Sequence, residues 1–322
     1  MNSFNLLKSD ERIYIAGHRG MVGSAIWRAL KRSGYGDFEK GGELLGASRS
    51  ELDLLDLVAV KEWFHQQKPT VVVLAAAKVG GIQANQDFPV DFLLENLKIQ
   101  NNLIETAWRS GVRRLLFLGS SCIYPKFANQ PISEDALMTG ALEVTNEPYA
   151  IAKIAGIKLC ENYFRQYKSD FISIMPNNLY GPNDNFDLKT SHVLPALIRK
   201  FHEAKINGDN FVEVWGTGKP LREFMHVDDL SSAIGFILQN DLFSEQILNI
   251  GSNEEISIAD LVLQIKEVIK FGGEISFNSD MPDGNPRKLL DSSKFHSYGW
   301  KPKIKLSEGL DDVYDWFVKN KS

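Results

Sequence analysis

The chain has 322 residues, with 36 basic and 41 acidic side chains and a net charge of −5. A nucleic-acid-binding protein needs a strongly basic face, so this balance argues against a nucleic-acid partner. The longest uninterrupted apolar run, residues 71–77, is far shorter than the about 20 residues of a membrane span. Only two cysteines occur, and the N-terminus lacks an apolar leader. We therefore expect a globular enzyme of the reducing cytoplasm, without a membrane partner.

Short apolar segments alternate with longer amphipathic segments along most of the chain. Helices are expected at 24–31 and 90–109, and a third should start at 146–148. Fully apolar strands separated by helices indicate a parallel sheet that is covered on both faces. The sequence therefore predicts an α/β fold with a doubly wound parallel sheet. Its strands are expected at 12–16, 43–47, 70–76, 114–118, 171–175 and 247–250.

The pattern changes after Leu179, where Gly, Pro, Asn and Asp cluster at residues 181–187. The strand expected at 247–250 should return to the first sheet. We therefore predict two domains, each assembled from two segments. The larger covers 10–179 and about 224–251, and the smaller C-terminal domain covers about 180–223 and 252–322.

A glycine-rich loop directly follows the first expected strand and leads into the first helix. Glycines at this spacing let the backbone turn tightly and approach a pyrophosphate at a helix N-terminus. A tight turn without a ligand would use the same residues, but the position between strand and helix favours a dinucleotide. The candidate contacts are Gly17, His18, Arg19, Gly20, Met21, Val22 and Gly23.

The end of the second expected strand indicates which dinucleotide binds. An NAD enzyme places an acid there for the ribose 2′-hydroxyl, whereas this segment has no acid before Glu51. Arg19 and Arg49 offer bidentate hydrogen bonds to a 2′-phosphate instead, and Ser48 belongs to the same candidate set. The sequence therefore predicts NADP(H).

A serine, a tyrosine and a lysine form a candidate catalytic trio. Tyr149 and Lys153 are four residues apart near a helix start, so they share one face of that helix. Ser120 follows the strand expected at 114–118, and the carboxyl end of a parallel strand faces the cofactor crevice. The alternative is a surface pair and a strand-end serine without catalytic roles.

The trio suits the reduction of a ketone, because hydride delivery to carbon must be matched by a proton for the oxygen. Tyrosine donates protons with an ordinary pKa of about 10. We expect the Lys153 ammonium and the nicotinamide charge to lower the pKa of Tyr149. Ser120 would hydrogen-bond the carbonyl oxygen and hold it near the phenol.

These motifs resemble the extended short-chain dehydrogenase/reductase superfamily. Segments 75–81 (AAAKVGG), 120–125 (SSCIYP), 146–150 (NEPYA) and 178–182 (NLYGP) are similar to the GDP-L-fucose synthases, and the resemblance runs from about 12 to 317. It implies a Rossmann domain and NADPH-dependent 3,5-epimerisation, then 4-keto reduction, of GDP-4-keto-6-deoxy-D-mannose. It also implies a homodimer formed through the two long helices. Two residues depart from the family pattern: Asn177 replaces threonine, and Ala47 replaces an arginine frequent in bacterial relatives.

The resemblance adds further site residues. It implies cofactor contacts from Leu118, Gly119, Ser120, Ser121, Lys153, Pro176, Asn177, Asn178, Leu179 and His192. It places the nucleotide sugar on Lys200, Trp215, Arg222 and Asp283, with Arg222 on the diphosphate and Asp283 on a sugar hydroxyl. From the residues alone, Trp215 is as compatible with core packing.

Inverting two carbons beside a ketone needs a base and an acid. The resemblance assigns Cys122 as the base and His192 as the acid, and both groups titrate near working pH. On extended backbone, Ser120 and Cys122 would point to the same side. From the residues alone, Cys122 is as compatible with a small buried side chain, and His192 with a polar loop residue.

Three alternatives remain at this stage. A nucleotide-sugar 4-epimerase or dehydratase of the same superfamily is the first, although dehydratases usually have Thr-Asp-Glu beginning at the position of Ser121. A dinucleotide-sensing protein without catalysis is the second, but such proteins tend to lose the tyrosine–lysine pair. A metal site at residues 226–229 is the third. No pair there has zinc-site spacing, so we expect a helix start and no metal.

Overall fold

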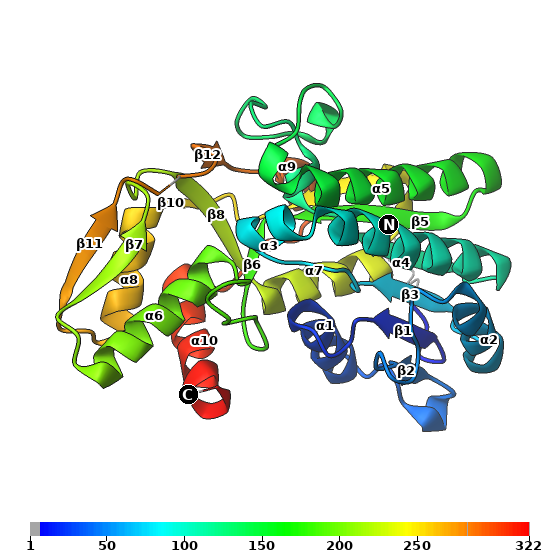
Figure 1. The fold of residues 1–322 in the computed structure, drawn as a ribbon. Helices are drawn as coiled ribbons and strands as arrows, with labels where there is room; N and C mark the ends of the chain where they lie inside the picture. Colours follow the sequence, from blue (N-terminus) through cyan, green and yellow to red (C-terminus); the bar gives the residue numbers. More distant parts are fainter. Residues whose placement is uncertain (1–6, 282, 322) are drawn as a thin grey trace.

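The apolar strands of the N-terminal part form one parallel sheet in the computed structural model, which describes residues 7–281 and 283–321 (Figure 1). The last of its six strands arrives from far along the chain and pairs with β5 in parallel. This confirms the predicted parallel sheet and the predicted return of 247–250. In spatial order the strands are β2 (Glu43–Leu45), β1 (Arg12–Ala16), β3 (Val71–Leu74), β4 (Arg114–Leu118), β5 (Asp170–Pro176) and β9 (Ile247–Ile250).

Helices cover both faces of this sheet because alternate strand residues point to opposite sides. Ile13 and Ile15 of β1 pack in one buried cluster with residues of two long helices and of the short helix at 293–297, whereas Tyr14 and Ala16 pack in another with residues of three helices. The helices of the first face are α1 (Met21–Arg32) and α7 (Val227–Gln239). Those of the second are α2 (Leu57–Gln67), α4 (Pro89–Arg109) and α5 (Glu147–Tyr167).

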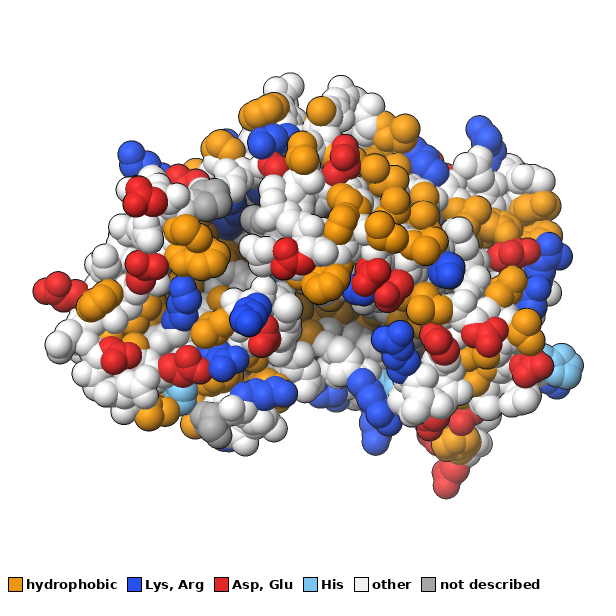
Figure 2. All heavy atoms as spheres, in the orientation of Figure 1, with side chains coloured by type: hydrophobic (Ala, Val, Ile, Leu, Met, Phe, Trp, Pro, Cys, Tyr) orange, Lys and Arg blue, Asp and Glu red, His pale blue; other side chains and the backbone are white. Residues whose placement is uncertain are grey.

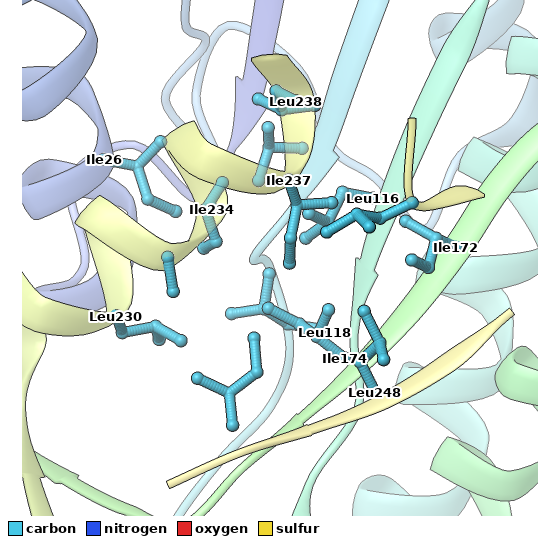
Figure 3. Close-up of a cluster of buried hydrophobic side chains, with 14 of the residues drawn as sticks. Ile26, Leu116, Leu118, Ile172, Ile174, Leu230, Ile234, Ile237, Leu238 and Leu248 are labelled. Carbon is cyan, nitrogen blue, oxygen red and sulfur yellow. The ribbon is translucent and has the colours of Figure 1, made fainter. Parts of the chain in front are cut away.

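The buried side chains of the first face hold the carboxyl end of β4 in place. Figure 3 shows Ile234 and Ile237 of α7 beside Leu116 and Leu118 of β4. Each such side chain contributes about 1.5–3 kcal/mol when it leaves water. The loop that follows β4 therefore starts from a rigid point.

Helices α4 and α5 pack closely on each other and on β4. Gln100 donates from Nε2 to the carbonyl oxygen of Ala152 at 2.6 Å, inside the core. A Cβ atom at Gly156 would lie 2.6 Å from the ring of Phe117, so only glycine allows this approach. The first turns of α5 are thereby held near the carboxyl end of β4.

The C-terminal part is built on smaller sheets and its own apolar cluster. Strand β8 (Leu221–His226) pairs with β6 (Asn178–Tyr180), β10 (Glu255–Ser257) and β12 (Arg287–Lys288), and β7 (Phe211–Trp215) pairs with β11 (Glu274–Asn278). The helices that contribute to the cluster are α6 (Val193–Asn207), α8 (Ile258–Ile269) and α10 (Leu306–Asn320). Two short helices, α3 (Ile82–Asp87) and α9 (Ser293–Ser297), complete the fold.

The predicted helix start at 226–229 is confirmed. The ring of His226 precedes α7 and accepts a hydrogen bond from the backbone of Asp228 at 3.3 Å. Within 7–281 and 283–321 no group of three or more metal-ligating side chains is present. No helix in that part of the chain is long and apolar enough to cross a membrane.

Candidate active site

The glycine-rich loop after β1 forms a narrow cradle at the start of α1. Gly17 has a φ of +85°, and its carbonyl oxygen accepts a hydrogen bond from Gly20 at 3.0 Å. A Cβ atom at Gly23 would overlap the backbone of Gly17. Since Gly20 has no side chain with which to cap α1, the first N–H groups of the helix remain available to an anion. Met21 and Val22 form the first turn of the helix.

His18 lies against the strand that precedes the proposed 2′-phosphate site. A Cβ atom at Gly46 would lie 2.6 Å from its ring. Burial and the positive charge of Arg19 lower the pKa of His18. Its Nδ1 is buried and has no hydrogen-bond partner within the described ranges. A buried polar atom without a partner is costly, so this atom suits a contact to a polar ligand.

The loop after β2 is shaped by Glu51. Ser48 donates to the carboxylate of Glu51 from its backbone nitrogen at 2.7 Å and from its hydroxyl at 2.6 Å. These hydrogen bonds, with the charge of Arg19, lower the pKa of Glu51. The Glu51 carboxylate is therefore hydrogen-bonded within its own loop. The Arg19 and Arg49 side chains are exposed beside it.

The structure brings the predicted trio together at the end of β4. Lys153 donates from Nζ to the carbonyl oxygen of Leu118 at 2.7 Å, and this Nζ lies 5.8 Å from the centre of the Tyr149 ring. The hydroxyl of Ser120 lies beside the phenol of Tyr149 and opposes part of the rise in its pKa. Burial lowers the pKa of Lys153 to about 7. The three groups therefore form one connected cluster.

The expected lowering of the Tyr149 pKa is wrong for the protein by itself. Burial of the phenol raises its pKa, and the negative charge of a Cys122 thiolate adds to this effect. Burial also weakens the positive charge of Lys153, because its own pKa falls. Tyr149 is consequently held in the protonated form, which is the form that donates.

The extended backbone expected between Ser120 and Cys122 is also wrong. Residues Ser121–Ile123 form a single 3₁₀ turn, η2, because the Ser120 hydroxyl accepts a hydrogen bond from the Cys122 nitrogen at 3.2 Å. The turn still places the thiol near this cluster, since Ser120 lowers the pKa of Cys122 and the charge of a Cys122 thiolate raises the pKa of Tyr149. The side chains of Ser120 and Cys122 are therefore close together, as expected, but a 3₁₀ turn and not extended backbone brings them there. Cys160, in contrast, is fully buried in the core.

His192 immediately precedes α6 and is open to solvent. The loop after β3 holds the segment that carries His192, because Gly81 donates to the carbonyl oxygen of Thr190 at 2.9 Å. A Cβ atom at Gly81 would lie 2.7 Å from the carbonyl oxygen of Ser191. The surrounding protein atoms and the positive charge of Lys288 lower the pKa of His192.

Lys288 is a site residue that the sequence did not reveal. It donates from Nζ to the sulfur of Cys122 at 3.4 Å. Burial alone would raise the pKa of Cys122, but the charge of Lys288 and hydrogen bonds from Lys288 and Ser120 lower it overall. A single lysine between Arg287 and Leu289 carries no spacing signal, so only the fold identifies it.

The segment after β5 passes below the cluster towards the C-terminal part. Pro176 ends β5, and Asn177 is buried beside Glu223. Asn178 donates from its amide to the carbonyl oxygen of Glu223 at 2.8 Å. Leu179 packs against the apolar cluster shared with α1 and α7. This segment therefore joins the two halves of the candidate site.

Two of the predicted nucleotide-sugar residues form a pair. The Nζ atom of Lys200 lies 5.2 Å from the centre of the Trp215 ring, an arrangement typical of a cation–π contact. Trp215 is 56% exposed, so the alternative of core packing is wrong. The pair offers a flat aromatic surface and a positive charge to solvent.

The other two residues lie next to each other on the same part of the fold. Arg222 donates to the backbone carbonyl of Asp283 at 3.4 Å. The carboxylate of Asp283 accepts hydrogen bonds from the nitrogen of Thr217 at 2.6 Å and from its hydroxyl at 2.8 Å. Asp283 therefore joins the turn after β7 to the segment before β12. Figure 2 shows the surface hollowed between this C-terminal part and the part with the six-stranded sheet.

We expect Gly23→Ala to damage both folding and the cradle, because the added methyl group would overlap the backbone of Gly17. Overpacking of this kind costs about 1–3 kcal/mol of unfolding free energy. Urea unfolding and NADPH fluorescence titration measure the two effects. Gly235→Ala is the control, since a Cβ atom there meets open space. Equal stability of both variants would contradict the expectation.

Comparison with known proteins agrees with this geometry. Residues 13–251 match the NAD dependent epimerase/dehydratase family. GDP-L-fucose synthase 1 of Arabidopsis thaliana is 56% identical over 96% of this chain and 94% of its own length. GDP-L-fucose synthase of Escherichia coli (strain K12) is 49% identical over 97% and 98%. The crystal structure of a GDP-L-fucose synthetase from Naegleria fowleri bound to NADP has a TM-score of 0.88 at 29% identity, covering 98% and 96%.

The fold, the arrangement of the cluster and the near-complete coverage of these relatives all lead to the same assignment. The chain belongs to the NAD dependent epimerase/dehydratase family and, within it, to the GDP-L-fucose synthases.

Proposed function

We propose that this protein converts GDP-4-keto-6-deoxy-D-mannose to GDP-L-fucose, by 3,5-epimerisation followed by reduction of the 4-keto group with NADPH. One observation carries the proposal: Cys122 donates from its backbone nitrogen to the hydroxyl of Ser120 at 3.2 Å, and its thiol lies near enough to Tyr149 for a thiolate there to raise the pKa of the phenol. A proton-abstracting group and a proton-donating group thus share one cluster. The names of the relatives at 49–56% identity support the same reaction.

NADP fits the cradle at the start of α1. The overlap that a Cβ atom at Gly23 would produce shows how tightly the loop turns onto the helix start, and the uncapped N–H groups there suit a phosphate. Arg19 and Arg49 would hold the 2′-phosphate, and the buried Nδ1 of His18 lacks a partner within the described residues. When bound, NADPH supplies the hydride for C4. The solved relative from Naegleria fowleri contains NADP.

Epimerisation comes first and uses Cys122 and His192. The thiolate of Cys122 takes a proton from the carbon beside the ketone, and the electron pair of that bond moves to the C4 oxygen. His192, which is open to cleft water, takes up a proton there and returns it to the opposite face of the carbon. The Cys122 thiol then gives its proton to cleft water, and repetition at the second carbon completes the 3,5-inversion.

Reduction then uses the trio. Ser120 holds the C4 oxygen by a hydrogen bond, and Tyr149 gives this oxygen its proton as the hydride arrives at carbon. Lys153, held by the carbonyl oxygen of Leu118, lies beside the phenol and would hold the ribose of a bound cofactor. Burial keeps Tyr149 protonated, so its donor form is present at neutral pH.

The nucleotide sugar would extend over the C-terminal part. Lys200 and Arg222 supply positive charge for the diphosphate, and the exposed ring of Trp215 supplies an aromatic surface. Asp283 would support sugar binding by fixing the turn at Thr217, whose nitrogen and hydroxyl donate to its carboxylate. Cofactor binding by one part of the chain and sugar binding by the other support the two-domain organisation predicted from the sequence. The domain boundaries and the cytoplasmic location stay predictions.

A homodimer is the proposed assembly. Figure 2 displays hydrophobic side chains gathered over α4 and α5, and Val90, Leu94 and Ile151 are exposed large side chains of these helices. An exposed apolar patch of this kind is typical of an interface. Equilibrium sedimentation, with Leu94→Glu as the disrupting variant, tests the proposal.

The alternative activities are less favoured. A dehydratase has an acid pair after the strand-end residue, whereas this chain has Cys122 and Ile123 in the turn there. A simple 4-epimerase retains its cofactor between turnovers and needs no base beside the trio. The relatives at 49–56% identity carry the name GDP-L-fucose synthase.

Incubation of the purified protein with GDP-4-keto-6-deoxy-D-mannose and NADPH tests the proposed function directly. We expect stoichiometric NADPH oxidation and a product whose NMR spectrum is that of GDP-L-fucose. A 4-reduced sugar that keeps the original configuration at C3 and C5 would overturn the epimerase half. No NADPH oxidation would overturn the reductase half.

We expect NADPH to be preferred over NADH by tenfold or more. Each charge-assisted hydrogen bond from Arg19 or Arg49 to the 2′-phosphate contributes about 1.5–3 kcal/mol. The ratio of kcat/KM for the two cofactors measures the preference, and Arg49→Ala should reduce it. Equal values for the two cofactors would show that Ala47 removes an essential part of the phosphate site.

A further inference from the structure

None of the steps proposed for epimerisation or reduction uses Lys288. Its Nζ atom donates to the sulfur of Cys122 at 3.4 Å. The lysine belongs to β12 in the C-terminal part, and the cysteine belongs to the turn after β4. The contact therefore brings a positive charge from one half of the molecule to the proposed base in the other.

The backbone on both sides of Lys288 is fixed. Strand β12 pairs in parallel with β8, with Lys288 opposite Arg222, and register partners in a sheet point to the same face. Leu289 donates to the side-chain oxygen of Gln130 at 2.8 Å, and Leu290 donates to the buried carboxylate of Glu223 at 3.0 Å. The Lys288 ammonium therefore lies on the same face of the sheet as Arg222, the residue proposed to bind the diphosphate.

Two other cations line the hollow around Cys122, and each has an acidic partner. Lys126 lies 2.9 Å from Glu143, and Arg287 lies 2.8 Å from Glu255. For Lys288, in contrast, residues 7–281 and 283–321 provide no carboxylate within the 4.0 Å of an ion pair. Its charge is therefore available to the sulfur.

Three further side chains face the Cys122 thiol, namely those of Ser120, Tyr149 and His192. Ser120 accepts a hydrogen bond from the Cys122 nitrogen, Tyr149 of α5 lies within electrostatic reach of the thiol, and burial keeps the phenol neutral. His192 is the titratable group from the segment before α6, and the charge of Lys288 acts on it as well. A cation beside both groups favours the thiolate of Cys122 and the neutral imidazole of His192.

We propose that Lys288 is the positioning residue that holds Cys122 as a thiolate for proton abstraction, an inference that rests on the proposed function. The proton moves from the substrate carbon to the sulfur, and the negative charge moves from the sulfur to the substrate enolate. Lys288 keeps its proton throughout and stays within the same hollow, so the charge is balanced before and after the transfer. Loss of the lysine leaves mostly uncharged thiol at neutral pH.

The first test reads the thiolate without any substrate. The rate at which iodoacetamide alkylates Cys122 is measured against pH by mass spectrometry of the peptide, in the unaltered protein and in Lys288→Met. Because the thiolate is the reactive form, we expect the rate at pH 7 to fall about tenfold or more and the midpoint to move to higher pH. An unchanged midpoint would overturn the proposal.

Two further variants separate charge from structure. Lys288→Arg keeps the positive charge and should restore a midpoint close to that of the unaltered protein. Arg287→Met removes a neighbouring charge from the same strand and should leave the midpoint where it was. If Lys288→Arg shifts the midpoint as much as Lys288→Met does, a charge effect is refuted.

The second test connects the thiolate to catalysis. Deuterium uptake from solvent at C3 and C5, followed without NADPH, should fall about tenfold or more in Lys288→Met at pH 7 and recover as the pH is raised. Recovery at high pH is a result that a merely misfolded variant would not give. Absence of uptake in the unaltered protein would overturn the proposed epimerase function, whereas the alkylation result would still decide the role of Lys288.

Discussion

Replacing Tyr149 by phenylalanine should lower the rate of NADPH oxidation by about 10²–10⁴-fold, the usual contribution of a general acid. The substitution removes the hydroxyl that lies beside Ser120 and leaves the ring on α5. Binding of NADPH should be unchanged, because Lys153 keeps its hydrogen bond to the carbonyl oxygen of Leu118. Stopped-flow oxidation of NADPH and fluorescence titration measure the two quantities.

Tyr163→Phe is a matched control for this experiment. Tyr163 lies on the same helix and packs against Trp108 and Phe171, so the same loss of a hydroxyl occurs away from the cluster. Its rate of NADPH oxidation should stay within about twofold of that of the unaltered protein. Near-normal oxidation by Tyr149→Phe would mean that another group protonates the C4 oxygen.

Replacing Cys122 by serine should abolish most epimerisation while the groups for hydride transfer stay in place. A serine hydroxyl is not appreciably ionised near neutral pH, so proton abstraction should slow by about 10²-fold or more. Deuterium uptake at C3 and C5, followed without NADPH, measures this step by itself. His192→Asn should slow the return of the proton, and partly inverted sugars should then accumulate or be reduced early.

Cys160→Ala provides the comparison, because it removes the other thiol from the buried core. Its deuterium uptake per folded molecule should equal that of the unaltered protein, even if its stability is lower. Uptake by Cys122→Ser at the unaltered rate would assign the cysteine to packing alone and would require a different base.

The sheet could be predicted from the sequence because its strands carry an unmistakable pattern. Residues 71–74 and 115–118 are all apolar and all buried, which is typical of a strand covered on both faces. The return of β9 to the sheet was predictable for the same reason. The start of α5 was predictable because Pro148 occupies the first turn, where the missing N–H costs nothing.

Features that depend on contacts between distant segments could not be predicted. Extended backbone was expected after β4, but the Ser120 hydroxyl instead caps a 3₁₀ turn. The pKa of Tyr149 depends on how deeply α5 packs on β4, which the glycine at 156 determines through its contact with Phe117. Lys288 reaches Cys122 only because β12 pairs with β8.

The attachment of β12 to β8 has a consequence for how this enzyme family can diversify. The groups that deliver the proton for reduction all come from one segment, 118–153, whereas the partner of the thiol arrives from position 288 and the returning acid from position 192. Substitutions at these two remote positions can therefore change the stereochemistry of the product while the segment 118–153 stays as it is. We expect descendants of such a chain to exchange one sugar for a diastereomer that differs at C3 and C5 by mutation outside the reducing centre.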